Sequence, residues 1–288
     1  MTIRLYPGLA ELAGRYDGFI LDLWGVIHDG VAPLPGAIDC LRALLAAGKR
    51  VALLSNAPRR ADDVIRRITA IGVPAGLYHH VMSSGEEAWQ YLKRREDPFY
   101  RALGRHCLQI GSDRDMSIRG ELDLDYVEDP AAADFILNTG PAGWDDTVED
   151  YRTLLDAALA RALPMVCANP DLVVQHGDKL ALCAGGLAQY YEAKGGRVRW
   201  HGKPYPSVYD TCLGLLGIAD RRQVLAVGDS LRTDVAGAAG AGIDCLFIVE
   251  GIHAAEFAPA GVPDLDRLAA AFERAAQKPI GVARRFSW

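Results

Sequence analysis

The sequence predicts an α/β protein whose core is a three-layer, Rossmann-like parallel sheet covered by helices. Short apolar runs alternate with helical patterns along the chain, which is typical of a parallel sheet wrapped by helices. Short polar residues also follow directly after several of these runs. The predicted core strands are residues 19–21, 51–54, 224–227 and 245–249, and helical patterns cover residues 36–47 and 59–70.

The middle of the chain repeats this pattern with different residues. Apolar runs at 108–110, 135–137 and 165–167 each end in polar or turn residues. A helical pattern over residues 148–160 joins the last two runs, which predicts a right-handed crossover between parallel strands.

The domain organisation follows from these two sets of strands. We expect residues 84–196 to form a second α/β module that is inserted into the first. The core is then discontinuous and consists of residues 1–83 and 197–288. No low-complexity linker separates the two parts of the chain.

The composition is that of an ordinary globular enzyme. The 288 residues are 50% hydrophobic and 24% charged, with a formal net charge of -6. Binding to a phosphate backbone needs a basic face, so we expect no nucleic-acid partner. The six cysteines contain no C-x-x-C pair, which favours buried thiols in a reducing compartment over zinc ligands or disulfides. Because we find no signal-peptide pattern and no membrane-spanning run, we expect a cytoplasmic protein without a membrane partner.

Polar side chains at the ends of the predicted strands indicate a single site. Asp22, Ser55 and Asp229 each come directly after an apolar strand candidate. In open α/β sheets, ligands bind at the carboxyl ends of the strands. Three separate segments therefore bring short polar groups to one edge of the sheet.

The residue types at this edge suit phosphoryl transfer. A carboxylate nucleophile works beside a divalent cation, because the cation offsets the repulsion between the carboxylate and the anionic phosphate. Magnesium prefers hard oxygen ligands, which Asp22, Asp229 and Asp234 can supply. Ser55 and Lys203 can hold the phosphate oxygens by charge-assisted hydrogen bonds.

Four segments resemble the ordered motifs of the phosphatases of the haloacid dehalogenase superfamily. They read FILDLWGVIHDG, VALLSNAPRR, HGKPYPSVYD and AVGDSLRTDVAGAAGAG. The strings G-K-P-x-P and G-D-S-L-R-T-D are similar to subclass IIA, which has a large α/β cap and includes nucleotide, pyridoxal-phosphate and phosphoglycolate phosphatases. The segments ANPD and GGLAQYYEAKGG in the middle of the chain are also similar to that subclass. The resemblance spans about residues 17 to 253.

The resemblance implies a role for each matching residue. Asp22 attacks phosphorus and binds magnesium, and Lys203 holds Asp22 and the phosphate. The other implied metal ligands are the backbone carbonyl of Trp24, Asp229 and Asp234. The implied phosphate or substrate contacts are Ser55, Asn56, Asn169 and Asp171.

Trp24 is the place where the chain departs from the motif. Phosphatases of the superfamily usually carry a second aspartate there, as the acid for the leaving group and then the base for water. Indole cannot perform this task at neutral pH, and acid–base help is worth roughly 10²–10⁴-fold in rate. The side chains that could replace it are His28, Asp29, Asp171 and His201.

Several of these residues also have a purely structural interpretation. Asp234 and the pair Ser55-Asn56 can serve as helix caps. Lys203 can be a solvated loop lysine, and Asn169-Pro170-Asp171 can be a simple turn. The Asp29-Gly30 pair is a hairpin signal, and residues 284–288 read as a plain terminus.

Three functions remain in competition on the sequence alone. The first is a magnesium-dependent phosphatase that acts on a small phosphorylated metabolite through an aspartyl-phosphate on Asp22. The second is a regulatory protein that binds phosphate with little or no turnover, which Trp24 favours. The third is a dehalogenase, because those members carry an aromatic residue two positions after the nucleophile, although they work without magnesium. The resemblance is compatible with a homodimer formed through the cap.

Overall fold

The computed structural model describes residues 3–176, 179–259 and 261–288, which form two compact units. The core unit consists of Met1–Ser55, Ile65–Met82 and Lys203–Trp288. The inserted unit consists of Asn56–Val64 and Ser83–Gly202. Both units are therefore discontinuous in sequence.

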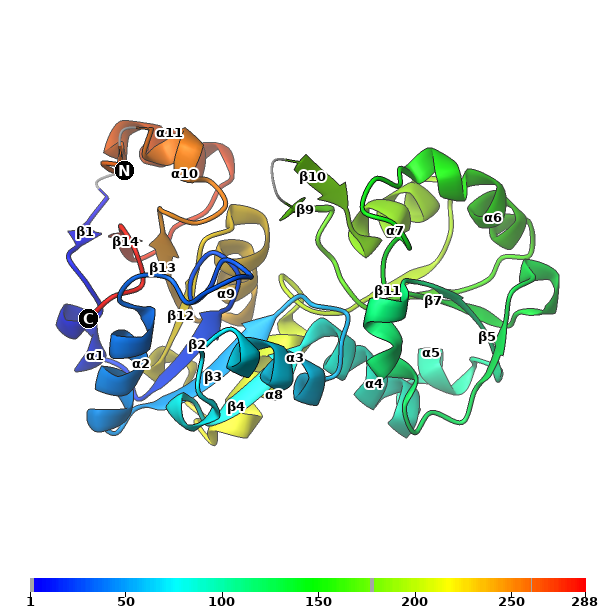
Figure 1. Ribbon diagram of the computed structural model, residues 1–288, viewed down its shortest axis with the longest axis horizontal. Helices are drawn as coiled ribbons and strands as arrows, with labels where there is room; N and C mark the ends of the chain where they lie inside the picture. Colours follow the sequence, from blue (N-terminus) through cyan, green and yellow to red (C-terminus); the bar gives the residue numbers. More distant parts are fainter. Residues whose placement is uncertain (1–2, 177–178, 260) are drawn as a thin grey trace. The chain divides into compact units, whose positions relative to one another are not determined.

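The core unit contains a seven-stranded sheet with the order β1-β14-β13-β12-β2-β3-β4 (Figure 1). Strand β2 lies between β12 and β3 and runs parallel to both. Strand β13 runs parallel to β12 and to β14. The strands are β1 (Leu5–Tyr6), β2 (Gly18–Asp22), β3 (Arg50–Ser55), β4 (His80–Ser83), β12 (Val224–Gly228), β13 (Asp244–Ile248) and β14 (Gly281–Ala283).

Helices of the core unit follow the strands in sequence. The small-residue stretch after β12 begins with one π-helical turn, η5, and continues as α9. Helix α3 begins in the inserted unit and ends in the core unit. The helices and helical turns are α1 (Ala10–Ala13), α2 (Ala37–Ala46), α3 (Ala61–Ala70), η1 (Ala75–Leu77), α8 (Pro206–Leu216), η4 (Arg221–Gln223), η5 (Leu231–Val235), α9 (Ala236–Ala241), α10 (Ala254–Phe257) and α11 (Leu265–Arg274).

The strands are near-continuous apolar runs, as expected of a parallel sheet that is buried on both faces. All five residues of β12 are buried, and β2 stays buried until Asp22. Alternate strand residues pack with side chains of α8, α9 and α11 in one hydrophobic cluster, which includes Ile20, Leu54, Ala226, Phe247, Cys212, Ala238 and Phe272. The prediction of an α/β fold with a parallel sheet is confirmed.

The inserted unit contains a five-stranded sheet with the order β11-β8-β7-β5-β6, in which neighbouring strands run parallel. A separate antiparallel hairpin is formed by β9 and β10. The strands are β5 (His106–Ile110), β6 (Asp125–Val127), β7 (Phe135–Asn138), β8 (Met165–Cys167), β9 (Val173–His176), β10 (Lys179–Leu182) and β11 (Val198–Trp200).

Helices of the inserted unit include α6, which begins at a capping box formed by Thr147 and Asp150. Two hydrophobic clusters fill this unit, one around Tyr191 and the other around Tyr100. The helices and helical turns are α4 (Ser84–Arg94), α5 (Pro98–Arg101), η2 (Asp113–Arg119), η3 (Pro130–Ala132), α6 (Val148–Ala160) and α7 (Ala184–Ala193).

Two smaller expectations can be compared with the structure. All six cysteines are buried, as predicted. The interpretation of residues 284–288 as a plain terminus was wrong, because Phe286 is buried and the carbonyl of Ser287 accepts a hydrogen bond from the Leu9 amide. No helix in the described part of the chain combines the length and apolarity needed to cross a bilayer.

Candidate active site

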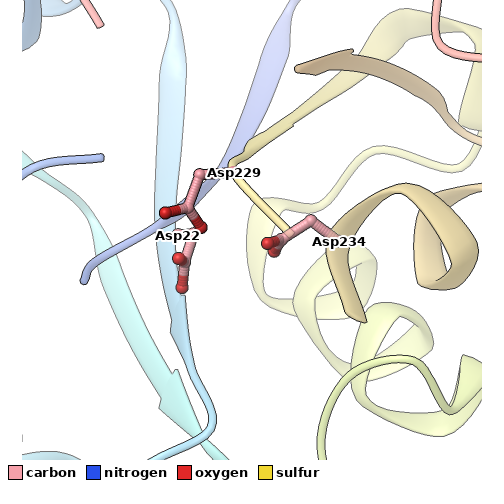
Figure 2. Close-up of side chains that lie close together, drawn as sticks. All are labelled: Asp22, Asp229 and Asp234. Carbon is pink, nitrogen blue, oxygen red and sulfur yellow. The ribbon is translucent and has the colours of Figure 1, made fainter. Parts of the chain in front are cut away.

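Three aspartates of the core unit lie together at the carboxyl end of the sheet. Asp22 is the last residue of β2, and Asp229 directly follows the neighbouring strand β12. Asp234 lies in the turn η5. Figure 2 shows the three carboxyl groups turned toward one another, and one oxygen of each lies within 4.8 Å of one oxygen of both others.

Lys203 connects two of these carboxylates. Its Nζ donates to Oδ1 of Asp22 at 2.5 Å and to Oδ1 of Asp234 at 2.8 Å. The side chain is buried, so the solvated-loop interpretation was wrong. Burial disfavours the charged ammonium, but the carboxylates of Asp22 and Asp234 outweigh burial and hold the pKa of Lys203 above its ordinary value.

The cluster holds more negative charge than one lysine can balance. Burial raises the pKa of Asp22 to about 7, against the opposing effect of Lys203. Burial also raises the pKa of Asp229 well above its ordinary value, and the charges of Asp22 and Asp234 add to the effect. Buried carboxylates are costly as anions unless a cation accompanies them. The donor set therefore fits a divalent cation with oxygen ligands.

Backbone groups orient the second and third carboxylates. The amide of Ile252 donates to Oδ2 of Asp229 at 2.6 Å, and the amide of Ser230 donates to Oδ2 of Asp234 at 3.1 Å. Glycines make room for Asp229, because a β-carbon at Gly25 or Gly251 would lie 2.1 or 2.0 Å from its Oδ2.

Ile252 and Gly251 belong to a loop that sequence reasoning missed. Glu250, at the start of this loop, forms ion pairs with Arg284 and with Arg285, whose Nη2 lies 2.7 Å from Oε2. The amide of Glu250 also donates to the carbonyl of Arg284 at 2.9 Å. The local sequence offers only a Glu-Gly pair after the predicted strand.

Trp24 lies two residues after Asp22 and is 42% exposed. Its ring meets the His28 ring edge-on, with centroids 5.7 Å apart. A β-carbon at Gly30, which has a φ of 92°, would lie 2.4 Å from Cη2 of the indole. The indole therefore packs closely against the turn that follows it.

The turn after Trp24 fixes two of the side chains considered as proton donors. The amide of Gly30 donates to Nδ1 of His28 at 3.0 Å. Oδ1 of Asp29 accepts from the amides of Val31 and Ala32, both at 2.8 Å. These contacts support the structural interpretation of the turn.

The predicted phosphate contacts fall into different units. Ser55 ends β3, whose Leu54 is paired with Asp22 across the sheet. Asn56 belongs to the inserted unit and donates from Nδ2 to Oδ1 of Asp171 at 2.9 Å. Oδ1 of Asn169 accepts from the amide of Asp171 at 2.9 Å, which is the hydrogen bond of an Asx turn.

His201 is buried inside the inserted unit. Its Nδ1 lies 3.2 Å from Oε2 of Glu87, and its Nε2 contacts the hydroxyl of Tyr100. Oε2 of Glu87 also accepts from the amide of Gly202 at 2.8 Å. His201 is therefore a member of a buried polar network, which the sequence pattern did not indicate.

The parallel sheet and the carboxylate cluster at its carboxyl edge define an α/β protein with an acidic site suited to a cation. A family model described as haloacid dehalogenase-like hydrolase matches residues 19–125, and a related HAD-hydrolase-like model matches residues 200–274. The crystal structure of a haloacid dehalogenase-like hydrolase from Brucella suis 1330 has 33% sequence identity, with a TM-score of 0.84 over 98% of this chain and 99% of that chain. The chain belongs to the haloacid dehalogenase-like hydrolase family.

Curated relatives are phosphatases. D-glycerol 3-phosphate phosphatase from Mycobacterium tuberculosis is 26% identical over 251 residues, which cover 86% of this chain and 67% of the relative. Ribonucleotide monophosphatase NagD from Escherichia coli K12 is 26% identical over 81% of this chain and 87% of its own length. The structure of 4-nitrophenylphosphatase from Thermotoga maritima has 25% identity and a TM-score of 0.71 over 95% of this chain and 96% of its own. These relatives confirm the predicted class, a phosphoric monoester hydrolase of subclass IIA.

Proposed function

We propose that this protein is a magnesium-dependent phosphatase that acts on a small phosphorylated metabolite through an aspartyl-phosphate on Asp22. The observation that carries the proposal is the cluster of half-buried Asp22 with buried Asp229 and Asp234, whose ligand atoms lie within 4.8 Å of one another. Lys203 at 2.5 Å from Asp22 adds a fixed cation beside the nucleophile. The composition supports a cytoplasmic protein without a nucleic-acid partner.

Asp22, Asp229, Asp234 and the backbone carbonyl of Trp24 are the groups that would hold the metal. Bound Mg²⁺ supplies positive charge that offsets the repulsion between carboxylate and phosphate. Its preference for oxygen ligands and retained waters suits a site of this composition. The amides of Ile252 and Ser230 keep the carboxylates of Asp229 and Asp234 in position.

Side chains of the protein supply the nucleophile and bind the phosphoryl group. An oxygen of Asp22 attacks phosphorus, and Lys203 restrains that carboxylate while it contacts the phosphate. Ser55 and Asn56 hold the phosphoryl oxygens. We infer that the inserted unit is the cap domain predicted over residues 84–196, with Asn169 and Asp171 as its substrate contacts.

Trp24 keeps a second candidate function open, a phosphate-binding protein with little turnover. An indole at this position offers neither acid nor base. A dehalogenase is less well supported, because the acidic cluster and its raised carboxyl pKa values fit a cation better than a neutral carbon–halogen bond.

The test is release of phosphate from 4-nitrophenyl phosphate with Mg²⁺ and with chelator. We expect turnover with Mg²⁺, loss of activity in chelator and loss in Asp22→Asn. Asp39→Asn is the matched control, because Asp39 is an exposed helix residue paired with Arg42. Phosphate-analogue binding without release, in the presence of Mg²⁺, would favour the regulatory function instead.

A further inference from the structure

We infer that the active site is specialised for phosphoryl donors whose leaving group departs without a proton, namely acyl phosphates and phosphoanhydrides, rather than alkyl phosphate esters. The inference rests on the proposed function, because it takes Asp22 as the nucleophile. It names the substrate class of that site. The argument comes from the side chains that surround the ends of β2 and β12.

The loop after Asp22 carries no side chain that is placed to give up a proton. Trp24 has only an indole N–H, which does not ionise near neutral pH. His28 accepts the Gly30 amide at Nδ1 at 3.0 Å, and its ring packs edge-on against the Trp24 ring. Asp29 accepts two backbone amides through one oxygen and lies at the surface of the turn.

The titratable side chains of the loop after β13 also contact other residues. Both oxygens of Glu250 are paired with arginines, Arg284 and Arg285. His253 has its Nδ1 3.6 Å from Oε2 of Glu256, and its ring lies against Phe257 with centroids 5.6 Å apart. Thus the titratable side chains of these two loops in the described core unit are held by contacts within the loops or by Arg284 and Arg285.

The titratable groups inside the cluster form hydrogen bonds with one another or with the backbone. Lys203 donates to Asp22 and Asp234, and Asp229 accepts from the Ile252 amide. In the inserted unit, His201 is 2% exposed and lies between Glu87 and Tyr100. Asp171 remains as a carboxylate to be tested, and it accepts from Asn56.

The first chemical step explains the selectivity. An oxygen of Asp22 forms a bond to phosphorus, and the bond from phosphorus to the leaving oxygen breaks. The leaving oxygen takes the electron pair. A carboxylate or phosphate leaving group is stable as an anion, whereas an alkoxide needs a proton from a general acid, which is worth roughly 10²–10⁴-fold in rate.

The second step, hydrolysis of the aspartyl-phosphate, gives an independent prediction. A water oxygen bonds to the phosphorus of the aspartyl-phosphate, the bond from phosphorus to Asp22 breaks, and the water proton passes to solvent. Without a general base this step is also slow by roughly 10²-fold or more. With an activated donor the phosphoenzyme therefore forms faster than it hydrolyses and accumulates.

The experiment is rapid-mixing kinetics of the full-length protein with Mg²⁺ and a series of donors. The series is acetyl phosphate, 4-nitrophenyl phosphate, phenyl phosphate and glycerol 3-phosphate. We expect a burst of about one product per protein molecule with the first two donors, followed by the same slow steady state. The phosphorylation rate should fall by at least about 10²-fold toward glycerol 3-phosphate.

Two substitutions at Trp24 separate the missing acid from other effects. Trp24→Asp should raise the glycerol 3-phosphate rate selectively, by about 10²-fold, and should remove the burst. Trp24→Phe adds no proton donor, so it should keep the steep dependence on the leaving group. Circular dichroism and thermal melting of both variants establish that each is folded.

Each result decides for or against the inference. Equal phosphorylation rates along the series would overturn it and leave the phosphatase function intact. A loss of glycerol 3-phosphate turnover alone in Asp171→Asn would also overturn it, because that carboxylate would then be the acid. Failure of every donor to phosphorylate the protein or release phosphate would instead refute the proposed function.

Discussion

Replacing Lys203 with methionine removes a buried ammonium that lies between the carboxylates of half-buried Asp22 and buried Asp234. The side chain is 3% exposed, and its Nζ is 2.5 Å from Asp22 and 2.8 Å from Asp234. Removing one partner of a buried charge pair costs about 3–5 kcal/mol, because the other charge stays buried without compensation. For a chain of this size, we expect a fall in melting temperature on the order of 10 °C.

Magnesium should reverse part of this loss. A cation that binds the folded protein stabilises it by about 2.7 kcal/mol at a concentration 100 times the dissociation constant. The carboxylates of Lys203→Met have lost their ammonium, so the variant should gain more from Mg²⁺ than the unmodified protein does. The assay is thermal unfolding with and without Mg²⁺.

The control is Lys194→Met, which breaks an exposed ion pair with Asp156 at 3.0 Å. Exposed pairs contribute about 0–1 kcal/mol, so this variant should melt close to the unmodified protein. If Lys203→Met melted no lower than Lys194→Met, and responded to Mg²⁺ no more strongly than the unmodified protein, the charge argument would be refuted.

Two further predictions concern the same site. In the metal-free protein, the pKa of Asp22 is about 7 against an ordinary value of 3.8. This raised pKa stabilises the folded protein below pH 3.8, and the contribution to the free energy of unfolding is lost as the pH rises through about 7. Urea unfolding at several pH values should therefore show a free energy of unfolding that falls over this range, and Asp22→Asn should reduce that pH dependence. Gly251→Ala puts a β-carbon 2.0 Å from Oδ2 of Asp229, so calorimetry should find Mg²⁺ bound about 10–100-fold more weakly. Gly214→Ala, where a β-carbon meets nothing within 4 Å, should bind Mg²⁺ as the unmodified protein does.

Local patterns in the sequence predicted most of the fold. The helical pattern over 148–160 coincides with α6, because a polar cap and an apolar face are both encoded within the helix itself. Asp22 and Asp229 could be placed at one sheet edge because each directly follows an apolar strand. Their convergence follows from the parallel pairing of β2 and β12, and Asp234 joins them from the turn η5.

Contacts between distant residues could not be predicted in this way. The Ile252 amide donates to Asp229, and Glu250 in the same loop pairs with Arg284 and Arg285, which lie over thirty residues later in the chain. Buried His201 is a similar case, because its partners Glu87 and Tyr100 lie more than a hundred residues earlier. Nothing in the local pattern around these residues encodes such pairing.

The separation of Asp22 from Lys203 by 181 positions has a consequence for folding. The entropy of closing a loop grows only with the logarithm of its length, at about 0.6 kcal/mol per doubling. The length of the intervening segment therefore adds little to the free-energy cost of bringing the two residues together, but contacts so distant in sequence form slowly. The cluster of Asp22, Asp229 and Asp234 should therefore be among the last features to form, and if it binds Mg²⁺ as proposed, the time course of Mg²⁺ binding during refolding would report the completion of the core.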